Sequence, residues 1–516
     1  MKKTLLLLSI LFIVVSCNKE ATQKDVASYG STITQKELKE HLYTYASDEF
    51  EGRETGEPGQ KKAVEYLKKY YETLGIKPVI EGNYFQNVPL NIVKTPEVSI
   101  SVNGKSFKYF DDFISPSAAA TGTVSTSEIV YAGYGIDDKK YSDYKDLDVK
   151  GKIVVIKSGE PKDKKGNNVI TGDKKASKWS NGRQAISSKR DAAKELGAKA
   201  LFFMDADLFA RYSKFFKQRE ASGGSKSLSL PAKKDAGTQM YFFLINEKMG
   251  KALASKIQKS TKPATVATKL EMSYKSITVP HPSENVAAMI KGSEKPDEYI
   301  IISSHLDHIG VNSKGEVNNG ADDDGSGTVS LLEIAEAFKT AADKGHRPKR
   351  SVIFLHVTGE EKGLLGSRYY TDYEPLVPLA NTVANLNIDM VGRIDPKRKG
   401  DRNYVYLIGS DKLSTELHNL SEQVNKTFTN IELDYTYNDE NDPNRFYYRS
   451  DHYNFAKNNI PIIFYFNGTH DDYHRASDTP DKINYDLLEN RSRLVFYTAW
   501  ELANRAERIV ADKATE

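Results

Sequence analysis

The second half of the chain alternates near-continuous apolar runs with stretches of helical periodicity. The apolar runs have the length of single strands and cover residues 285–290, 299–304, 352–357, 383–388, 404–408 and 462–466. The helical stretches cover residues 327–342, 414–426, 451–458 and 485–508. Strands without polar alternation are covered on both faces. The pattern therefore predicts an α/β fold in which helices sandwich a mixed, mostly parallel sheet.

Residues that commonly bind metals stand at the ends of several of these runs. They occur in SSHLDH, GADDDGSG, TGEEKG, NLNIDMVG and DDYHRASDT, and the five candidate ligands are His305, Asp323, Glu361, Asp389 and His474. Two histidines and three carboxylates suit zinc, and one shared carboxylate makes the number sufficient for two ions. In such sheets, bound ions and small molecules lie beyond the carboxyl ends of the strands. The pattern indicates a metal-dependent hydrolase.

Neighbours of these ligands have predicted roles of their own. Glu360 adjoins Glu361, and because adjacent side chains point different ways, Glu360 can face the substrate water as a general base. Asp307 lies two residues after His305, so it is a candidate to orient the imidazole through a hydrogen bond. His308 is expected to be structural or to line the cleft.

Three consecutive aspartates, Asp322 to Asp324, precede the apolar helix predicted at 327–342. Such a run is ordinarily a solvated turn or a helix cap. Here the first turn of the helix must be buried, and adjacent buried carboxylates repel one another unless a cation neutralises them. We therefore expect this segment to bind metal.

The N-terminus has the composition of an export signal. Positions 2 and 3 are lysines, and residues 5–15 are nearly all apolar. Cys17, the only cysteine, ends the segment VVSC. The apolar run is too short to span a bilayer but fits the core of an export signal. Cys17 either belongs to a discarded leader or is the acylated residue of a lipobox. Its placement resembles bacterial lipoprotein signals, so we expect residues 1–17 to be a lipoprotein signal and the exported protein to be held at the periplasmic or cell-surface face of a membrane through lipidated Cys17.

Residues 18–30 are polar and are expected to be a tether. A capping-box pattern at Thr34 and Glu37 predicts a helix to about residue 45, and a second amphipathic helix is predicted at 60–74. Between them lies a charged, glycine-rich loop, DEFEGRETGEPG.

Length and charge limit the possible organisation. At 516 residues, two domains after any leader are expected. The net charge of +3 is small, and acids interleave with the lysines, so nothing indicates a nucleic-acid partner. Short strands and turns replace the earlier pattern from about residue 122 to 275, where no candidate ligand occurs. This stretch is predicted to be an inserted module.

Six segments in order, HLDHIG, GADDDGSG, TGEEKGLLGS, NIDMVGR, RSDHYNFAKNNIPIIFYFNG and YHRASDTPDKI, together resemble the co-catalytic di-zinc aminopeptidases. These zinc exopeptidases are related to bacterial leucyl aminopeptidase, glutamate carboxypeptidase II and the transferrin receptor. A looser resemblance, in SEIVYAGYGI, DVKGKIVVI and AAKELGAKALFFM, is to the β-rich protease-associated domain often inserted in them. The resemblance implies a zinc-exopeptidase (phosphorylase/hydrolase-like) fold, with peptidase parts at 31–117 and 276–510 and the insert at 118–275.

The resemblance also implies a role for each site residue. Asp323 would bridge two zinc ions per chain, with His305 and Asp389 completing one site and Glu361 and His474 the other. Glu360 would be the general base, and Asp307 would lie behind His305. The tyrosine that polarises the substrate carbonyl corresponds to Tyr447, although the adjacent Tyr448 could substitute.

The implied activity is removal of N-terminal residues from peptides with a free N-terminus. A carboxypeptidase or dipeptidase of the same clan is the nearest alternative, and it would need arginines for the substrate carboxylate, for which Arg393, Arg445 and Arg449 are candidates. A single-zinc glutaminyl cyclase and a non-catalytic receptor-like protein are further alternatives. The complete set of five ligands counts against both.

Overall fold

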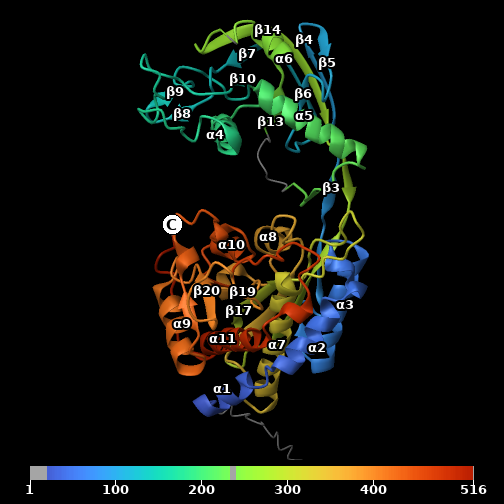
Figure 1. Ribbon diagram of the computed structural model, residues 1–516, viewed down its shortest axis with the longest axis vertical. Coiled ribbons are helices and arrows are strands. Elements are labelled where there is room, and N and C mark those ends of the chain that lie inside the picture. Colours follow the sequence, from blue (N-terminus) through green and yellow to red (C-terminus); the bar gives the residue numbers. More distant parts are fainter. Residues whose placement is uncertain (1–19, 233–239, 258, 515–516) are drawn as a thin grey trace, which may run out of the picture. The chain divides into compact units, whose positions relative to one another are not determined.

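The computed structural model describes residues 20–232, 240–257 and 259–514. The predicted signal and Cys17 lie outside the described residues. Among the helices that are described, none is long and apolar enough to cross a membrane. The chain divides into two compact units, Met1–Pro89 with Pro282–Glu516 and Leu90–His281 (Figure 1). The second unit therefore interrupts the sequence of the first.

A nine-stranded mixed sheet forms the centre of the first unit, in the order β1-β16-β18-β17-β19-β22-β20-β21 with β2 beside β16. The strands are β1 (Lys77–Pro78), β2 (Phe85–Val88), β16 (Ser283–Ile290), β17 (Lys295–His305), β18 (Arg350–Val357), β19 (Thr382–Ile388), β20 (Tyr404–Ile408), β21 (Glu432–Asp434) and β22 (Ile462–Phe466). β18, β17, β19 and β22 are parallel, whereas β16 and β20 pair antiparallel with β18 and β22. The predicted α/β fold is confirmed, and each of the six apolar runs is a strand.

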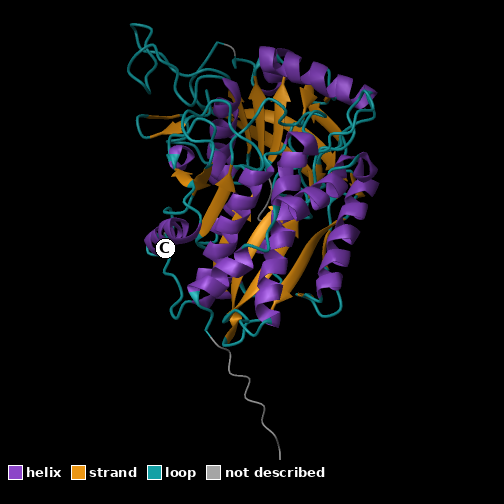
Figure 2. Cartoon of the chain, turned by 60° about the horizontal axis from the view of Figure 1, so that its bottom comes forward, coloured by secondary structure: helices purple, strands orange, loops and turns teal. Residues whose placement is uncertain are grey.

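Helices cover both faces of this sheet. They are α1 (Gln23–Gly30), α2 (Gln35–Tyr45), α3 (Pro58–Leu74), α7 (Gly327–Asp343), α8 (Leu365–Asp372), α9 (Thr415–Phe428), α10 (His452–Ala456) and α11 (Tyr485–Asn504). Ile300 and Ile302 of β17 lie in the same core as residues of α7 and α11. Ile301, which points to the other face, shares a core with Tyr370 of α8 and Phe455 of α10. In Figure 2 several of these helices lie over the strands, as the uninterrupted apolar runs predict.

The expected tether at 18–30 is wrong from residue 23 onward, because this part of the chain is helix α1. Thr22 and Asp25 form a reciprocal capping box at its start. Val26 and Tyr29 are buried in the main core of the first unit, and the Tyr29 ring lies 5.8 Å from that of Trp500. Two apolar side chains on a polar helix were too few to predict this docking.

The second unit has its own sheet, in the order β5-β4-β14-β7-β10-β11-β13-β6. The strands are β4 (Glu97–Val102), β5 (Lys105–Phe107), β6 (Phe113–Ile114), β7 (Gly122–Tyr131), β10 (Ile153–Lys157), β11 (Ala200–Met204), β13 (Tyr241–Ile245) and β14 (Ala264–Lys275). Helices α4 (Gly182–Glu195), α5 (Ala206–Ala221) and α6 (Glu247–Leu253) belong to it, as do two small sheets, β12-β3-β15 (Leu228–Ser229, Asn91–Val93, Thr278–Pro280) and β8-β9 (Asp137–Asp138, Tyr141–Ser142).

The boundaries of this unit differ from the predicted insert at 118–275. Residues 90–117, which we expected in the first part of the peptidase domain, belong to the second unit instead. The reason is strand pairing, because β4 lies antiparallel to β14 with Ile100 opposite Met272. The protease-associated character of this unit stays a prediction.

Candidate metal centre

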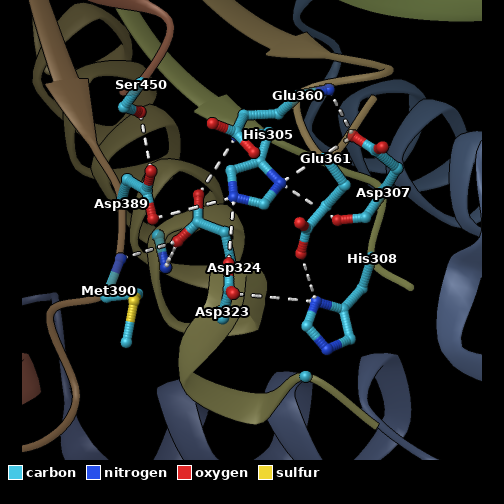
Figure 3. A network of polar contacts seen from close by, with 12 residues as sticks. His305, Asp307, His308, Asp323, Asp324, Glu360, Glu361, Asp389, Met390 and Ser450 are labelled. Atoms are coloured by element: carbon cyan, nitrogen blue, oxygen red, sulfur yellow. Dashed lines mark hydrogen bonds and ion pairs between the residues drawn. The ribbon is translucent and has the colours of Figure 1, made fainter. Parts of the chain in front are cut away.

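The predicted ligands meet at one edge of the first unit's sheet. His305 ends β17, Asp389 directly follows β19, and Glu361 lies just after β18. These strands are parallel neighbours, so their carboxyl ends lie side by side. Asp323 comes from the turn before α7, and His474 from the segment after β22. Figure 3 shows the side chains of His305, Asp323 and Asp389 pointing toward one another.

The distances place Asp323 at the centre of the five residues. Its Oδ1 lies 3.2 Å from His305 Nε2, and its Oδ2 lies 3.1 Å from His474 Nε2. His305 Nε2 is also 3.7 Å from Asp389 Oδ1, while His474 Nε2 is 3.0 Å from Glu361 Oε2. Each oxygen of Asp323 therefore faces a different pair of residues, which is the arrangement that a carboxylate shared by two ions requires.

Several polar atoms inside this cluster lack ordinary hydrogen-bond partners. His305 Nε2, Asp323 Oδ2 and Glu361 Oε1 are buried and make no well-aligned hydrogen bond within the part of the chain that is described. Buried polar atoms are normally satisfied, so each such atom requires an explanation. Cations bound in the two groups of residues would provide partners for these atoms, and the mixed nitrogen and oxygen donors suit zinc. The residues present therefore fit a metal ion.

Burial and mutual repulsion shift the titration of the cluster. Burial raises the pKa of Asp324 well above its usual range, and it does the same for Glu360, aided by the carboxylates of Asp389 and Glu361. Burial lowers the pKa of His474, but its close contacts with the carboxylates of Asp323 and Glu361 outweigh this and raise the value to about 10. The buried carboxylates repel one another, and a bound cation would offset that repulsion.

Distance alone also permits a second grouping of ligand atoms, with Asp324 beside His305 and His308 beside Glu361. Asp324 is already engaged, since its carboxylate accepts N–H groups of His305, Gly327 and Met390 at 2.9–3.1 Å. His308 is different. Its Nδ1 lies 2.9 Å from Glu361 Oε1 and 3.9 Å from Asp323 Oδ2. His308, expected to be structural or to line the cleft, is thus a rival to His474.

Asp307 lies behind His305, as expected, but it acts through its backbone. The Nδ1 of His305 is 3.0 Å from the carbonyl oxygen of Asp307 and 3.8 Å from its carboxylate. Donation from Nδ1 to the carbonyl leaves Nε2 free to bind a metal. The carboxylate of Asp307 instead accepts the backbone N–H of Glu360, 3.2 Å away.

Two supporting contacts were missed in the sequence. Ser450 donates its hydroxyl to Asp389 Oδ2 over 2.6 Å. Asp478 accepts the N–H groups of Asp322 and Asp323 at 3.0 and 3.2 Å, so it joins the segment of His474 to the central aspartate. Both residues stand inside the six segments that resemble the aminopeptidase family, but only the folded chain shows which atoms they contact.

A small cavity of about 30 Å³ adjoins the cluster. Three phenylalanines form apolar parts of its wall, and the lining residues are Asp323, Glu360, Asp389, Met390, Phe446, Arg449, Phe464, Phe466, Thr469 and Tyr473. Tyr473 stacks on His474 with ring centroids 3.9 Å apart. Burial raises the pKa of Tyr473, as do the carboxylates of Asp323 and Glu361, so the phenol keeps its proton.

Tyr447 does not line this cavity. It lines a separate one of about 750 Å³ together with Tyr448, Asp411 and Lys412. The phenol beside the ligands is therefore that of Tyr473, which sequence reasoning missed. Its position next to a candidate ligand, His474, was the available signal.

Comparison with known proteins identifies the segment that carries this cluster. Residues 285–499 match the model of peptidase family M28. The chain is 35% identical over 120 residues to a probable glutamate carboxypeptidase LAMP1 of Arabidopsis thaliana, covering 23% of this chain and 16% of that protein. It is 38% identical over 109 residues to aminopeptidase NAALADL1 of Mus musculus, covering 21% of this chain and 14% of that protein.

A longer match is to a probable leucine aminopeptidase 2 of Aspergillus oryzae, 26% identical over 332 residues, covering 56% of this chain and 62% of that one. The chain thus spans about a sixth of the length of the first two relatives. All five predicted ligands lie within the matched segment. Residues 285–499, the segment that carries all five, are similar to peptidase family M28.

Proposed function

We propose that the chain is a zinc-dependent aminopeptidase that holds two zinc ions and removes N-terminal residues from peptides. The observation that carries the proposal is the central position of Asp323, whose two oxygens lie 3.2 and 3.1 Å from the imidazoles of His305 and His474. Asp389 and Glu361 complete the two groups. The match of this segment to a peptidase family and the similarity to two aminopeptidases support the substrate class.

Zinc in such a site supplies a Lewis acid for the substrate carbonyl and lowers the pKa of a water that it binds. Glu360 lines the cavity but has no place among the ligand groups. Its carboxylate is therefore placed to take the proton of the attacking water and to pass it to the leaving amine. The hydrogen bond from its N–H to Asp307 fixes the backbone from which this side chain projects.

The wall of the cavity suggests the preferred residue. Phe446, Phe464 and Phe466 line one part of it, close to Asp389 and Glu360. Contact with these rings would favour an apolar N-terminal side chain, with about 25 cal/mol gained per Å² of apolar area removed from water, and the cavity of about 30 Å³ must widen to admit it. We therefore propose a preference for apolar N-terminal residues.

Tyr473→Phe is expected to lower kcat by about 10²-fold with little change in zinc content, whereas Tyr447→Phe is expected to leave kcat within about twofold. The reason is position, since the Tyr473 phenol lies beside the ligands and can donate to the carbonyl oxygen as charge develops there. Steady-state kinetics and zinc analysis of the two variants measure the effect. A large loss in Tyr447→Phe alone would restore the role that the sequence assigned to Tyr447.

A carboxypeptidase is the second candidate, because one arginine reaches the cavity and one relative is a probable glutamate carboxypeptidase. That arginine is Arg449, which lies over the Phe446 ring. The other two arginines are engaged elsewhere. Arg393 pairs with Asp472 at 2.9 Å, and Arg445 stacks on Tyr448. One arginine in the cavity is a weaker signal than the cluster that a terminal carboxylate requires.

Blocking either end of a peptide separates the two candidates. N-terminal acetylation of a good substrate is expected to abolish cleavage, whereas C-terminal amidation leaves the rate unchanged, because an aminopeptidase binds the free α-amine. Initial rates on matched apolar peptides, with products identified by mass spectrometry, provide the measurement. The opposite pattern would assign a carboxypeptidase, and release of pyroglutamate without peptide cleavage would assign a cyclase.

A further inference from the structure

The glycine-rich loop between α2 and α3 packs against the segments that carry the ligands. Gly52 has φ 64°, and a Cβ there would lie 2.5 Å from the carbonyl oxygen of Asn318 and 2.6 Å from that of Gly310. Only glycine permits this approach. The carbonyl of Gly52 accepts the N–H of Gly310, and that of Arg53 accepts the N–H of His308. The loop is thereby paired with the segment that follows His305.

The same loop reaches two further ligand segments. The buried guanidinium of Arg53 donates to the carbonyl oxygens of Asn319 and Gly320 at 2.7 and 2.9 Å, just before the aspartate turn. Glu54 pairs with Lys362 at 3.0 Å, next to Glu361. One loop, far from the ligands in the sequence, thus contacts three segments that supply them.

Thr55 makes the most direct contact of this loop with the site. Its hydroxyl donates to Asp307 Oδ2 over 2.6 Å, and both side chains are almost completely buried. Asp307 in turn accepts the backbone N–H of Glu360 through Oδ1, at 3.2 Å, and the Nδ1–H of His305 through its carbonyl, at 3.0 Å. Asp307 therefore holds both a ligand and the expected base, and Thr55 holds Asp307.

We propose that Thr55 is a positioning residue, which fixes Asp307 so that His305 presents Nε2 to a metal and Glu360 keeps its backbone in place. The proposal rests on the proposed zinc function. Without the hydroxyl, Oδ2 of Asp307 loses its buried donor, and the hydrogen bond from the Glu360 N–H to Oδ1 fixes the carboxylate less firmly. Groups behind metal ligands commonly alter metal affinity or activity by about 10- to 100-fold when they are replaced.

Three variants of the full chain test this role. Thr55→Val removes the hydroxyl with little change of shape, and Thr55→Ser keeps it. Thr382→Val is the matched control, because Thr382 is a buried threonine of the same unit whose hydroxyl has no hydrogen-bond partner in the described structure. Zinc affinity is measured by competition with a chromophoric chelator, and kcat and KM are measured on an apolar aminoacyl chromophore.

Thr55→Val is expected to bind one zinc ion about 10-fold more weakly and to lower kcat about 10-fold at nearly constant KM. Thr55→Ser and Thr382→Val are expected to stay within about twofold of the unsubstituted protein in every quantity. If the valine variant does not fold, Thr55→Ala, which relieves crowding by the added methyl group, is expected to show the same losses.

Two results would overturn the inference alone. Wild-type zinc affinity and kcat in both Thr55→Val and Thr55→Ala would show that the hydroxyl positions nothing. Equal losses in Thr55→Ser and Thr55→Val would show that packing, not the hydrogen bond, matters at this position. Absence of zinc binding by the unsubstituted chain would overturn the proposed function, and the inference with it.

Discussion

Replacing Glu360 with glutamine is expected to lower kcat by about 10² to 10⁴ while the zinc content stays unchanged. Glutamine has the shape of glutamate but cannot take a proton from water. The Glu360 side chain lines the cavity beside Asp323 and Asp389, yet it stands outside both groups of ligand atoms. Steady-state kinetics together with elemental analysis of the purified variant provide the measurement.

Glu361→Gln is the matched control, because the same change is made one residue away. Glu361 lies 3.0 Å from His474 and 2.9 Å from His308, so its loss should remove metal. We expect this variant to lose zinc and to regain part of its activity at high zinc concentration. Equal loss of zinc in the two variants would show that Glu360 is also a ligand.

The sheet of the first unit was predictable because its strands are buried on both faces. The runs that became β17, β18 and β19 are mostly apolar, and strands of this kind occur in parallel sheets between helices. The same property located the ligands, since His305 and Asp389 stand at or just beyond strand ends. Local sequence therefore specified both the strands and the edge at which the site forms.

The limits of the second unit could not be predicted in the same way. Its start depends on β4, a strand of alternating burial whose partner β14 lies more than 150 residues later. No local signal in the sequence of β4 specifies such a partner. Helix α1 was missed for a related reason, since its few apolar residues are buried by docking on α7 and α11, which lie far away in the sequence.

Supporting residues of the site were missed because their roles depend on contacts between distant segments. Thr55 and Asp307 are 252 positions apart, and Asp478 and Asp322 are 156 apart. A threonine in a glycine-rich loop has many ordinary roles, and its sequence neighbours do not reveal which carboxylate it meets. The metal ligands themselves can be predicted from residue type, whereas the residues that support them can be identified only in the folded chain.

Asp323→Ala is expected to weaken binding of both zinc ions, because each oxygen of Asp323 faces a different group of ligands. Structural zinc sites bind with about 10–16 kcal/mol shared among four ligands, so one ligand contributes roughly 3 kcal/mol, or about 10²-fold in affinity. A bridging ligand serves both sites, so its loss weakens both. Elemental analysis is expected to give two ions per chain in the unsubstituted protein, and chelator competition is expected to show affinity about 10²-fold weaker at both sites of this variant.

His474→Ala and His308→Ala distinguish the rival histidines of the second group. If His474 is the ligand, its removal should lower the affinity for one zinc ion by about 10²-fold and leave the other ion in place. His308→Ala should then retain both ions. The geometry favours His474, whose Nε2 lies within 3.1 Å of both Asp323 and Glu361, whereas His308 is 3.9 Å from Asp323. Loss of one ion in His308→Ala with both retained in His474→Ala would reverse the assignment. Loss of both ions in His474→Ala would mean that the two groups do not bind metal independently.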